Sequence, residues 1–151
     1  MYKLSAIRDA GGPWEYRIKL SEQAVKISNP GVLQVRRFRQ GDGFVGDAIH
    51  NVAEPVPDRW VMVDPMDATR RKKFPADAAF EDLLVPVVRD GDFVYEAPPL
   101  EAIRARTREQ LAGFHDGVKR FLNPHQYPVG LEKGLFDLKT RLIMKARGLE
   151  E

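Results

Sequence analysis

The stretch FLNPHQYPVGLEKGLFDLKTRLI, residues 121–143, places a proline-rich turn directly before a strongly patterned segment. Asn123-Pro124 and Tyr127-Pro128 favour extended or turn backbone, and Gly130 permits a further turn. Apolar residues then recur at spacings of three and four, which is typical of one helical face. They are Leu131, Leu135, Leu138, Leu142 and Ile143. The sequence therefore predicts a closing helix that is entered through a rigid turn.

The end of this helix is marked as well. Lys145 and Arg147 lie near its C-terminus, where positive charge interacts favourably with the helix dipole, and Gly148 supplies a stop. Inside the preceding turn lies His125, for which two interpretations are open. It could be a catalytic group, or the turn could fix the entry angle of the helix while His125 makes a local hydrogen bond. The second interpretation has more support, because the flanking prolines already restrict the backbone.

Composition narrows the class of protein. The chain has 151 residues, about one domain, and is 43% hydrophobic and 30% charged, the balance of a folded, soluble protein. No apolar run approaches the roughly 20 residues of a membrane span, and no signal-peptide pattern opens the chain. Cysteine is absent, which excludes thiolate chemistry and fits a cytoplasmic location. The net charge of +2 implies no strongly polyanionic partner.

The first half predicts short strands separated by turns. In residues 16–20 apolar and charged side chains alternate strictly, which is typical of a strand with one face buried. Gly41-Asp42-Gly43 predicts a hairpin within residues 39–49. Further strands are expected at residues 2–7, 32–38 and 59–64.

The second half becomes helical. A hairpin is expected around Asp90-Gly91, and Pro86 makes one of its runs an edge strand. Pro98-Pro99 then starts a predicted helix, and a short helical turn is expected at residues 118–122. The apolar face of the first of these helices contains Leu100, Ile103, Thr107, Leu111 and Phe114. The pattern predicts an α+β fold, with short antiparallel strands and hairpins in residues 1–97 and a helical closing part in residues 98–151.

Candidate chemistry in the chain is sparse. None of the three histidines, His50, His115 and His125, has a second histidine at metal-ligand spacing. Asp64 and Asp67 could bind a hard cation, but turn hydrogen bonds explain them equally well. No glycine-rich phosphate loop and no nucleophile elbow is present. These patterns nominate no catalytic, cofactor-binding or metal-binding residue.

The basic run Arg70 to Lys73 has two interpretations. It could contact phosphate or nucleic acid through charge, or it could be a solvated loop. The run is short and contains no interleaved aromatic residue, so nucleic acid is an unlikely partner.

Several motifs together resemble one family. They are YKLSAI at residues 2–7, IKLSEQAVKISNPG at 18–31, VGDAI at 45–49, VDPMDATRRKKFP at 63–75 and, most specifically, NPHQYPVGLEKGLFDLKTRLI at 123–143. The chain is similar to the C-terminal region of nicotinate phosphoribosyltransferases. It departs from the family after the Pro-Gly turn, where Val32 and Leu33 replace a frequent lysine.

The resemblance implies a division of labour. The catalytic barrel of the family, with its ATP and magnesium, has no counterpart in this sequence, so no catalytic residue is carried over. The resemblance implies one domain of a longer cytoplasmic enzyme of NAD salvage, inactive alone, whose partner is the barrel domain of that enzyme or a second copy of this chain. The alternative is a stand-alone binding or regulatory module derived from the same region.

Overall fold

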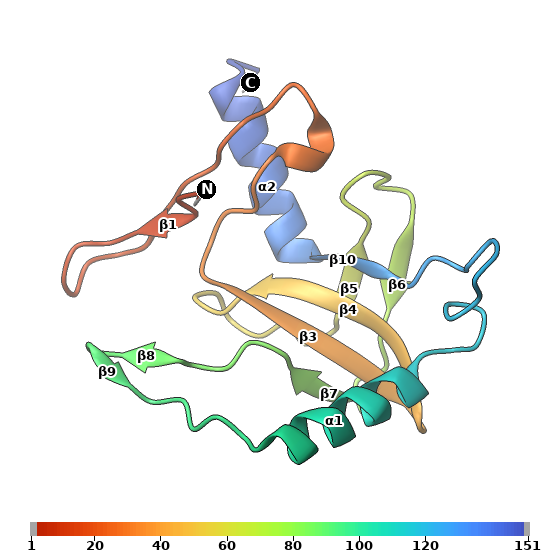
Figure 1. The fold of residues 1–151 in the computed structure, drawn as a ribbon. Helices are drawn as coiled ribbons and strands as arrows, with labels where there is room; N and C mark the ends of the chain where they lie inside the picture. Colours follow the sequence, from red (N-terminus) through yellow and green to blue (C-terminus); the bar gives the residue numbers. More distant parts are fainter. Residues whose placement is uncertain (1–2, 150–151) are drawn as a thin grey trace.

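A six-stranded mixed sheet forms the centre of the computed structural model, which describes residues 3–149 (Figure 1). The strand order is β6-β5-β10-β4-β3-β7, and within this sheet β10 and β4 run parallel while the other neighbours are antiparallel. The strands are β3 (Leu33–Gln40), β4 (Gly43–Asn51), β5 (Val61–Val63), β6 (Arg71–Lys73), β7 (Ala79–Asp82) and β10 (Val129–Glu132).

The long hairpin of β3 and β4 is the backbone of this sheet. Its turn contains Gly41 with φ of 57°, the left-handed conformation that glycine adopts without steric cost. The hairpin predicted from the glycine-rich turn is therefore confirmed. The register shifts between Phe38 and Arg39, which gives the end of the hairpin near the turn an irregularity.

Strand β10 was not predicted, and the prediction that Leu131 lies on the closing helix is wrong. Leu131, expected on the helical stripe, pairs instead with Ile49 of β4 and Val63 of β5. A side chain at Gly130 would place its Cβ 2.5 Å from the carbonyl oxygen of Val63. The glycine thus permits a close approach of strands rather than a turn, and sheet pairing decides the conformation.

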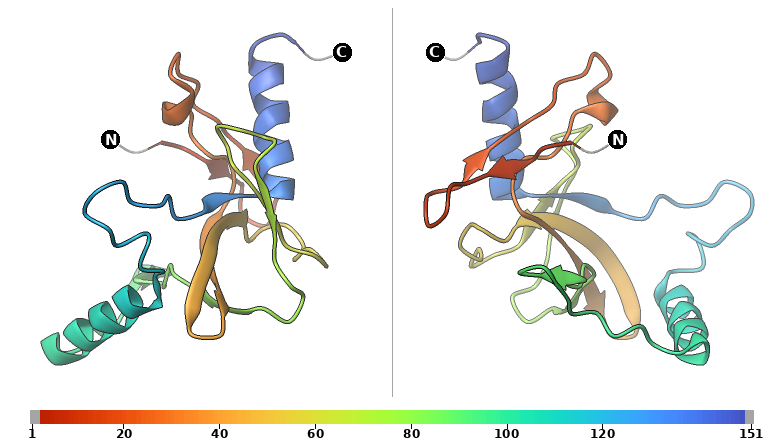
Figure 2. Two further views of the ribbon diagram at one scale, coloured as in Figure 1. Left: turned by 90° about the vertical axis from the view of Figure 1, so that its right-hand side faces the viewer. Right: turned by 60° about the vertical axis from the view of Figure 1, so that its left-hand side comes forward.

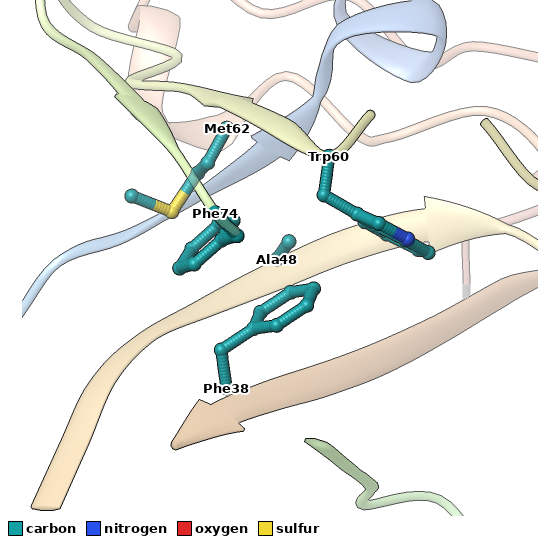
Figure 3. Close-up of a cluster of buried hydrophobic side chains, with 5 residues drawn as sticks. All are labelled: Phe38, Ala48, Trp60, Met62 and Phe74. Atoms are coloured by element: carbon teal, nitrogen blue, oxygen red, sulfur yellow. The ribbon is translucent and has the colours of Figure 1, made fainter. Parts of the chain in front are cut away.

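One face of the sheet carries an aromatic cluster (Figure 3). Phe38 is only 1% exposed; its ring stacks on Phe74 with centroids 3.9 Å apart and meets Trp60 edge-on at 5.3 Å. Ala48 and Met62 complete the cluster. Because side chains alternate across a strand, the neighbours of Phe38 and Ala48 point to the opposite face.

The opposite face is covered at one end by helix α2 (Lys133–Ala146) (Figure 1). Leu135, Leu138 and Leu142 pack there against Leu131 and Ile49. From Leu135 onward the predicted apolar stripe is confirmed, as is the stop at Gly148, with φ of 68°. Glu132 is the N-cap of this helix, and its carboxylate accepts a hydrogen bond from the backbone N–H of Leu135.

Loss of this cap gives a first prediction. The Glu132→Ala variant leaves an amide of the first helical turn without its acceptor, and we expect unfolding free energy to fall by about 1 kcal/mol. Urea denaturation at pH 7 measures it. Glu132→Asp keeps a carboxylate at the cap and is the matched control; equal stability of the alanine variant and the wild type would show that the cap contributes nothing.

The periphery departs from the sequence predictions in several places. The first hairpin consists only of β1 (Ala6–Ile7) and β2 (Glu15–Tyr16). Residues 17–20, which were expected to continue the second strand, are not in a strand. Tyr2, in the first expected strand, lies outside the described residues. A 3-10 turn, η1 (Ala24–Lys26), precedes β3. Residues 118–122 form turns and bends rather than a helix. Residues 17–20 keep the predicted alternation of burial, because Ile18 and Leu20 are partly buried and Arg17 and Lys19 are exposed, but they pair with no strand.

The remaining elements are a hairpin of β8 (Val88–Arg89) and β9 (Asp92–Phe93), followed by helix α1 (Leu100–Gly113). The hairpin around Asp90-Gly91 is confirmed, but residues 83–87, including Pro86, are not in a strand. Helix α1 buries only Gly113, although its apolar face was expected to pack. The α+β class is confirmed, and among residues 3–149 no helix combines the length and apolar character that crossing a bilayer requires.

Candidate functional site

A cavity of about 330 Å³ lies where β4 ends and α2 begins. Tyr16, the segment after β4 and the first turns of α2 form its walls. Its polar side chains come from Tyr16, His50, Asn51, Glu54, Glu132 and Arg141. It is the candidate site because concave surface and converging polar groups coincide there.

Two buried side chains at this site have polar atoms without a partner. His50 is 8% exposed and Asn51 5% exposed; neither Nε2 of His50 nor Nδ2 of Asn51 makes a hydrogen bond within the described residues. The ring of His50 meets Trp60 edge-on, with centroids 5.0 Å apart. Asn51 is otherwise well used, because its Oδ1 accepts hydrogen bonds from the backbone N–H groups of Val32 and Ala53. Asn51 therefore holds the backbone in place, and His50 is a buried ring against an aromatic wall.

The two carboxylates at the cavity already accept hydrogen bonds from within the protein. The hydroxyl of Tyr16 donates to Glu54 over 2.6 Å, and burial followed by this hydrogen bond raises the pKa of Tyr16. Glu132 caps α2. Within residues 3–149 no group of three or more metal-ligating side chains is assembled. The cavity offers hydrogen bonds to a small polar molecule but no nucleophile with an adjacent base.

Burial also makes His50 a source of pH dependence. Desolvation, reinforced by the positive charge of Arg36, lowers the pKa of His50, while Asp82 and Glu132 oppose the shift. The unfolded chain therefore binds the proton first as pH falls below about 6.5, and stability decreases in that range. Above about 6.5 the imidazole is neutral in both states and the effect vanishes.

We expect His50→Gln to flatten this dependence. Urea denaturation at pH 7.5 and 5.5 should show a larger loss of unfolding free energy for the wild type than for the variant. The carboxylates with lowered pKa, Asp67, Glu81, Asp82 and Asp116, titrate in a more acidic range and do not distort the comparison. Identical losses for the two proteins would exclude His50 as the cause.

The other two histidines lie together, away from this cavity. The rings of His115 and His125 are nearly parallel with centroids 6.3 Å apart. Nδ1 of His115 accepts from the N–H of Gly117, and the backbone N–H of His125 donates to the carbonyl of Gly117. The proposed turn hydrogen bond of His125 exists, but the backbone makes it. The turn connects α1 to β10 and thereby returns the chain to the sheet.

Asp64 and Asp67 form turns. Asp64 accepts from the backbone N–H of Met66 over 2.8 Å, and Asp67 accepts from both the N–H and the hydroxyl of Thr69. The pKa of Asp67 is lowered by these hydrogen bonds to Thr69. The structure places the two carboxylates in consecutive turns and gives each a local role.

Residues 71–73 of the basic run form a strand rather than a loop, although Arg70, Arg71 and Lys73 are exposed to solvent as that interpretation expected. Arg71–Lys73 form edge strand β6, and Lys72 donates to the carbonyl of Val45 over 2.5 Å. Nε of Arg71 donates to the carbonyl of Ala68. Nη1 of Arg70 forms an ion pair with Oδ2 of Asp64 over 3.6 Å. Arg70, Arg71 and Lys72 also line a cavity of about 260 Å³ beside Tyr127. Pairing of the strand with β5 overrides the loop-like composition.

Sequence reasoning missed a buried polar network that joins four segments. Arg37 of β3 makes two hydrogen bonds to Asp47 of β4, at 3.0 and 2.7 Å, and a third to Gln110 of α1 at 2.8 Å. The hydroxyl of Tyr127 donates to the same Asp47 over 2.8 Å. The guanidinium of Arg37 lies over the ring of Phe44, 4.7 Å from its centroid.

The pKa values of the two titratable partners of Asp47, Arg37 and Tyr127, are both shifted. The hydrogen bond to Asp47 raises the pKa of Arg37. Burial first, and the hydrogen bond to Asp47 second, raise the pKa of Tyr127 far above its usual value. The only sequence signal was the broken alternation in residues 32–38, where Arg36 and Arg37 interrupt an apolar strand. The network is suited to holding segments together, since every charge in it is paired.

Comparisons with known proteins agree on one family. The profile of the nicotinate phosphoribosyltransferase C-terminal domain matches residues 34–139. Nicotinate phosphoribosyltransferase 2 of Arabidopsis thaliana is 32% identical over 127 residues, 80% of this chain and 23% of that protein. The crystal structure of human nicotinic acid phosphoribosyltransferase superimposes with a TM-score of 0.68 at 26% identity, over 88% of this chain and 27% of that one.

The chain thus spans about a quarter of the length of these relatives. The resemblance drawn from the sequence motifs is confirmed, since the matched residues include the turn and the closing helix up to residue 139. This chain belongs to the nicotinate phosphoribosyltransferase C-terminal domain family.

Proposed function

We propose that this chain is the C-terminal structural portion of a nicotinate phosphoribosyltransferase. The complete enzyme joins nicotinate to phosphoribosyl diphosphate, giving nicotinate mononucleotide and diphosphate, with ATP hydrolysis coupled to the step. The observation that supports this role is that the relatives match over the C-terminal domain alone, about a quarter of their length. The chain by itself supplies scaffold, and the reactive groups come from the remaining polypeptide.

The chemistry of the described residues supports the same division. Magnesium needs oxygen ligands gathered around one point. Among residues 3–149 no cluster of three or more histidine, aspartate or glutamate side chains is assembled. In this proposal ATP and magnesium belong to the catalytic part of the enzyme, and no step of the reaction is assigned to this chain.

Reconstitution of activity tests the proposal. This chain is co-expressed with a tagged polypeptide that carries the catalytic barrel of a nicotinate phosphoribosyltransferase, and the pair is purified through the tag. We expect the two to co-purify and to form nicotinate mononucleotide from nicotinate, phosphoribosyl diphosphate and ATP at a rate that neither reaches alone.

Two outcomes would overturn the proposal. Turnover by this chain alone would place the catalytic groups within it. Failure to associate with the barrel polypeptide would favour the stand-alone module, in which the same region binds another partner.

A further inference from the structure

The segment from residue 83 to residue 114, called here the outer arm, leaves the body of the protein after β7 and contains the β8–β9 hairpin and α1. It lies on the side of the sheet remote from α2 (Figures 1 and 2). An isolated two-stranded hairpin is marginally stable in water, and an isolated helix of the length of α1 is marginal too. Within residues 3–149 the two strands bury no residue and α1 buries only Gly113, so both elements receive little apolar packing.

Apolar side chains of the outer arm are exposed in both elements. Residues that carry this exposed surface include Val85 (57% exposed), Val88 (61%), Phe93 (70%), Leu100 (55%), Ile103 (47%) and Leu111 (55%). Single exposed apolar side chains are ordinary, but a concentration of them in one segment marks an interaction surface.

Polar contacts, by contrast, connect α1 to the sheet. Arg106 donates to Glu81 of β7 over 2.5 Å, and Gln110 both donates to Glu81 and accepts from Arg37. A surface helix normally turns its apolar face to the core and its polar face to water. In α1 the polar Arg106 and Gln110 share one side of the helix with Ile103, and Leu100, Ile103 and Leu111 stay about half exposed. The sheet therefore leaves this apolar side uncovered, which indicates that a further surface covers it.

That side of α1 is also concave. A groove of about 610 Å³ is lined by Tyr95 and Pro98 before the helix and by apolar and polar side chains along it, namely Ala102, Ile103, Arg106, Thr107, Gln110, Leu111 and Phe114. The position of Phe114 in this groove is fixed, because its ring packs edge-on against Phe44 and Tyr127. The groove is thus held in shape by the Arg37–Asp47 network at one end of α1 and stays open along its length.

We propose that the outer arm is the surface that docks the remaining polypeptide of the enzyme, through the apolar face of α1 and the β8–β9 hairpin. This rests on the function proposed above. The family match, residues 34–139, includes the whole outer arm, so the arm belongs to the shared domain. In the relatives about three quarters of the chain lies outside the match, which supplies an occupant large enough to cover both elements.

The test uses this full chain and two triple variants. The arm variant combines Val88→Gln, Ile103→Gln and Leu111→Gln. The matched control combines Val25→Gln, Val52→Gln and Val56→Gln, which are similarly exposed, at 74%, 51% and 69%, but lie outside the arm. Binding to the barrel polypeptide is measured by co-purification and titration. We expect the arm variant to bind at least about tenfold more weakly, since several apolar anchors are lost, and the control to bind like the wild type.

Hydrogen exchange supplies a second readout. Amides of residues 88–113 should exchange rapidly in the free chain and become protected when the barrel polypeptide binds. If wild type, arm variant and control all bind equally, or protection appears elsewhere, the docking surface is refuted while the proposed function stands.

Two other outcomes separate the inference from its premise. If even the wild type fails to bind, the proposed function itself is overturned. If the free chain forms a dimer that the arm variant abolishes, and barrel binding is unaffected by the variant, the arm joins two copies of this chain and the proposal is wrong.

Discussion

Replacing Asp47 with alanine is expected to lower the free energy of unfolding by about 3–5 kcal/mol. The side chains of Arg37 and Asp47 are only 14% and 8% exposed. The variant leaves the guanidinium of Arg37 without its counter-ion and the hydroxyl of Tyr127 without its acceptor. A buried charge without a partner keeps its full desolvation cost, which makes this one of the largest effects a single change can have.

Urea denaturation at pH 7, followed by tryptophan fluorescence, measures this loss. The double variant Arg37→Leu, Asp47→Leu removes both charges and should be clearly more stable than Asp47→Ala, because no uncompensated charge remains. Tyr127→Phe removes only the phenolic hydroxyl and should cost about 1 kcal/mol. If Asp47→Ala costs less than about 1 kcal/mol, the network does not hold the sheet to α1 in the way the structure indicates.

The Phe38→Ala variant should lose about 3–5 kcal/mol through a different mechanism. Phe38 is 1% exposed and stacks on Phe74, with Trp60 at its edge (Figure 3). Truncation removes the apolar burial and the aromatic contacts and leaves a cavity in the sheet face. Trp60 lies beside that cavity, so its fluorescence should shift as well.

A matched control is available within the chain. Phe121 is 98% exposed, so Phe121→Ala should leave the urea midpoint unchanged. Equal effects of the two phenylalanine variants would contradict the assignment of the core to the aromatic cluster. A loss for Phe38→Ala near that of a surface substitution would do the same.

Local signals in the sequence were sufficient for several elements. The positive φ of Gly41 needs no tertiary partner, so its turn could be predicted, and so could the turn at Asp90-Gly91. The apolar stripe of α2 reads directly from its spacing because the helical period is a property of the backbone. The prolines before α1 set its start for the same reason.

The polar network around Asp47 and the candidate site were much harder to predict from the sequence. Asp47 looked like one residue of a hairpin, and Arg37 like one of a basic pair; only the folded chain brings them to Gln110 and Tyr127. His50 could be named as a candidate, but not its burial beside Trp60. Long-range contacts of this kind leave no periodic signal, because each partner is far away along the chain.

The sequence by itself determined the α+β class, the closing helix and, through its motifs, the family. Tertiary structure alone decided that residues 129–132 join the sheet as a strand parallel to β4, that three residues of the basic run form an edge strand, and that apolar side chains of α1 stay exposed. The physical reason is that turns and helical periodicity are local properties of the backbone. Strand pairing, burial and the direction a helix faces depend on which distant surfaces meet, and those surfaces are settled only when the whole chain has folded.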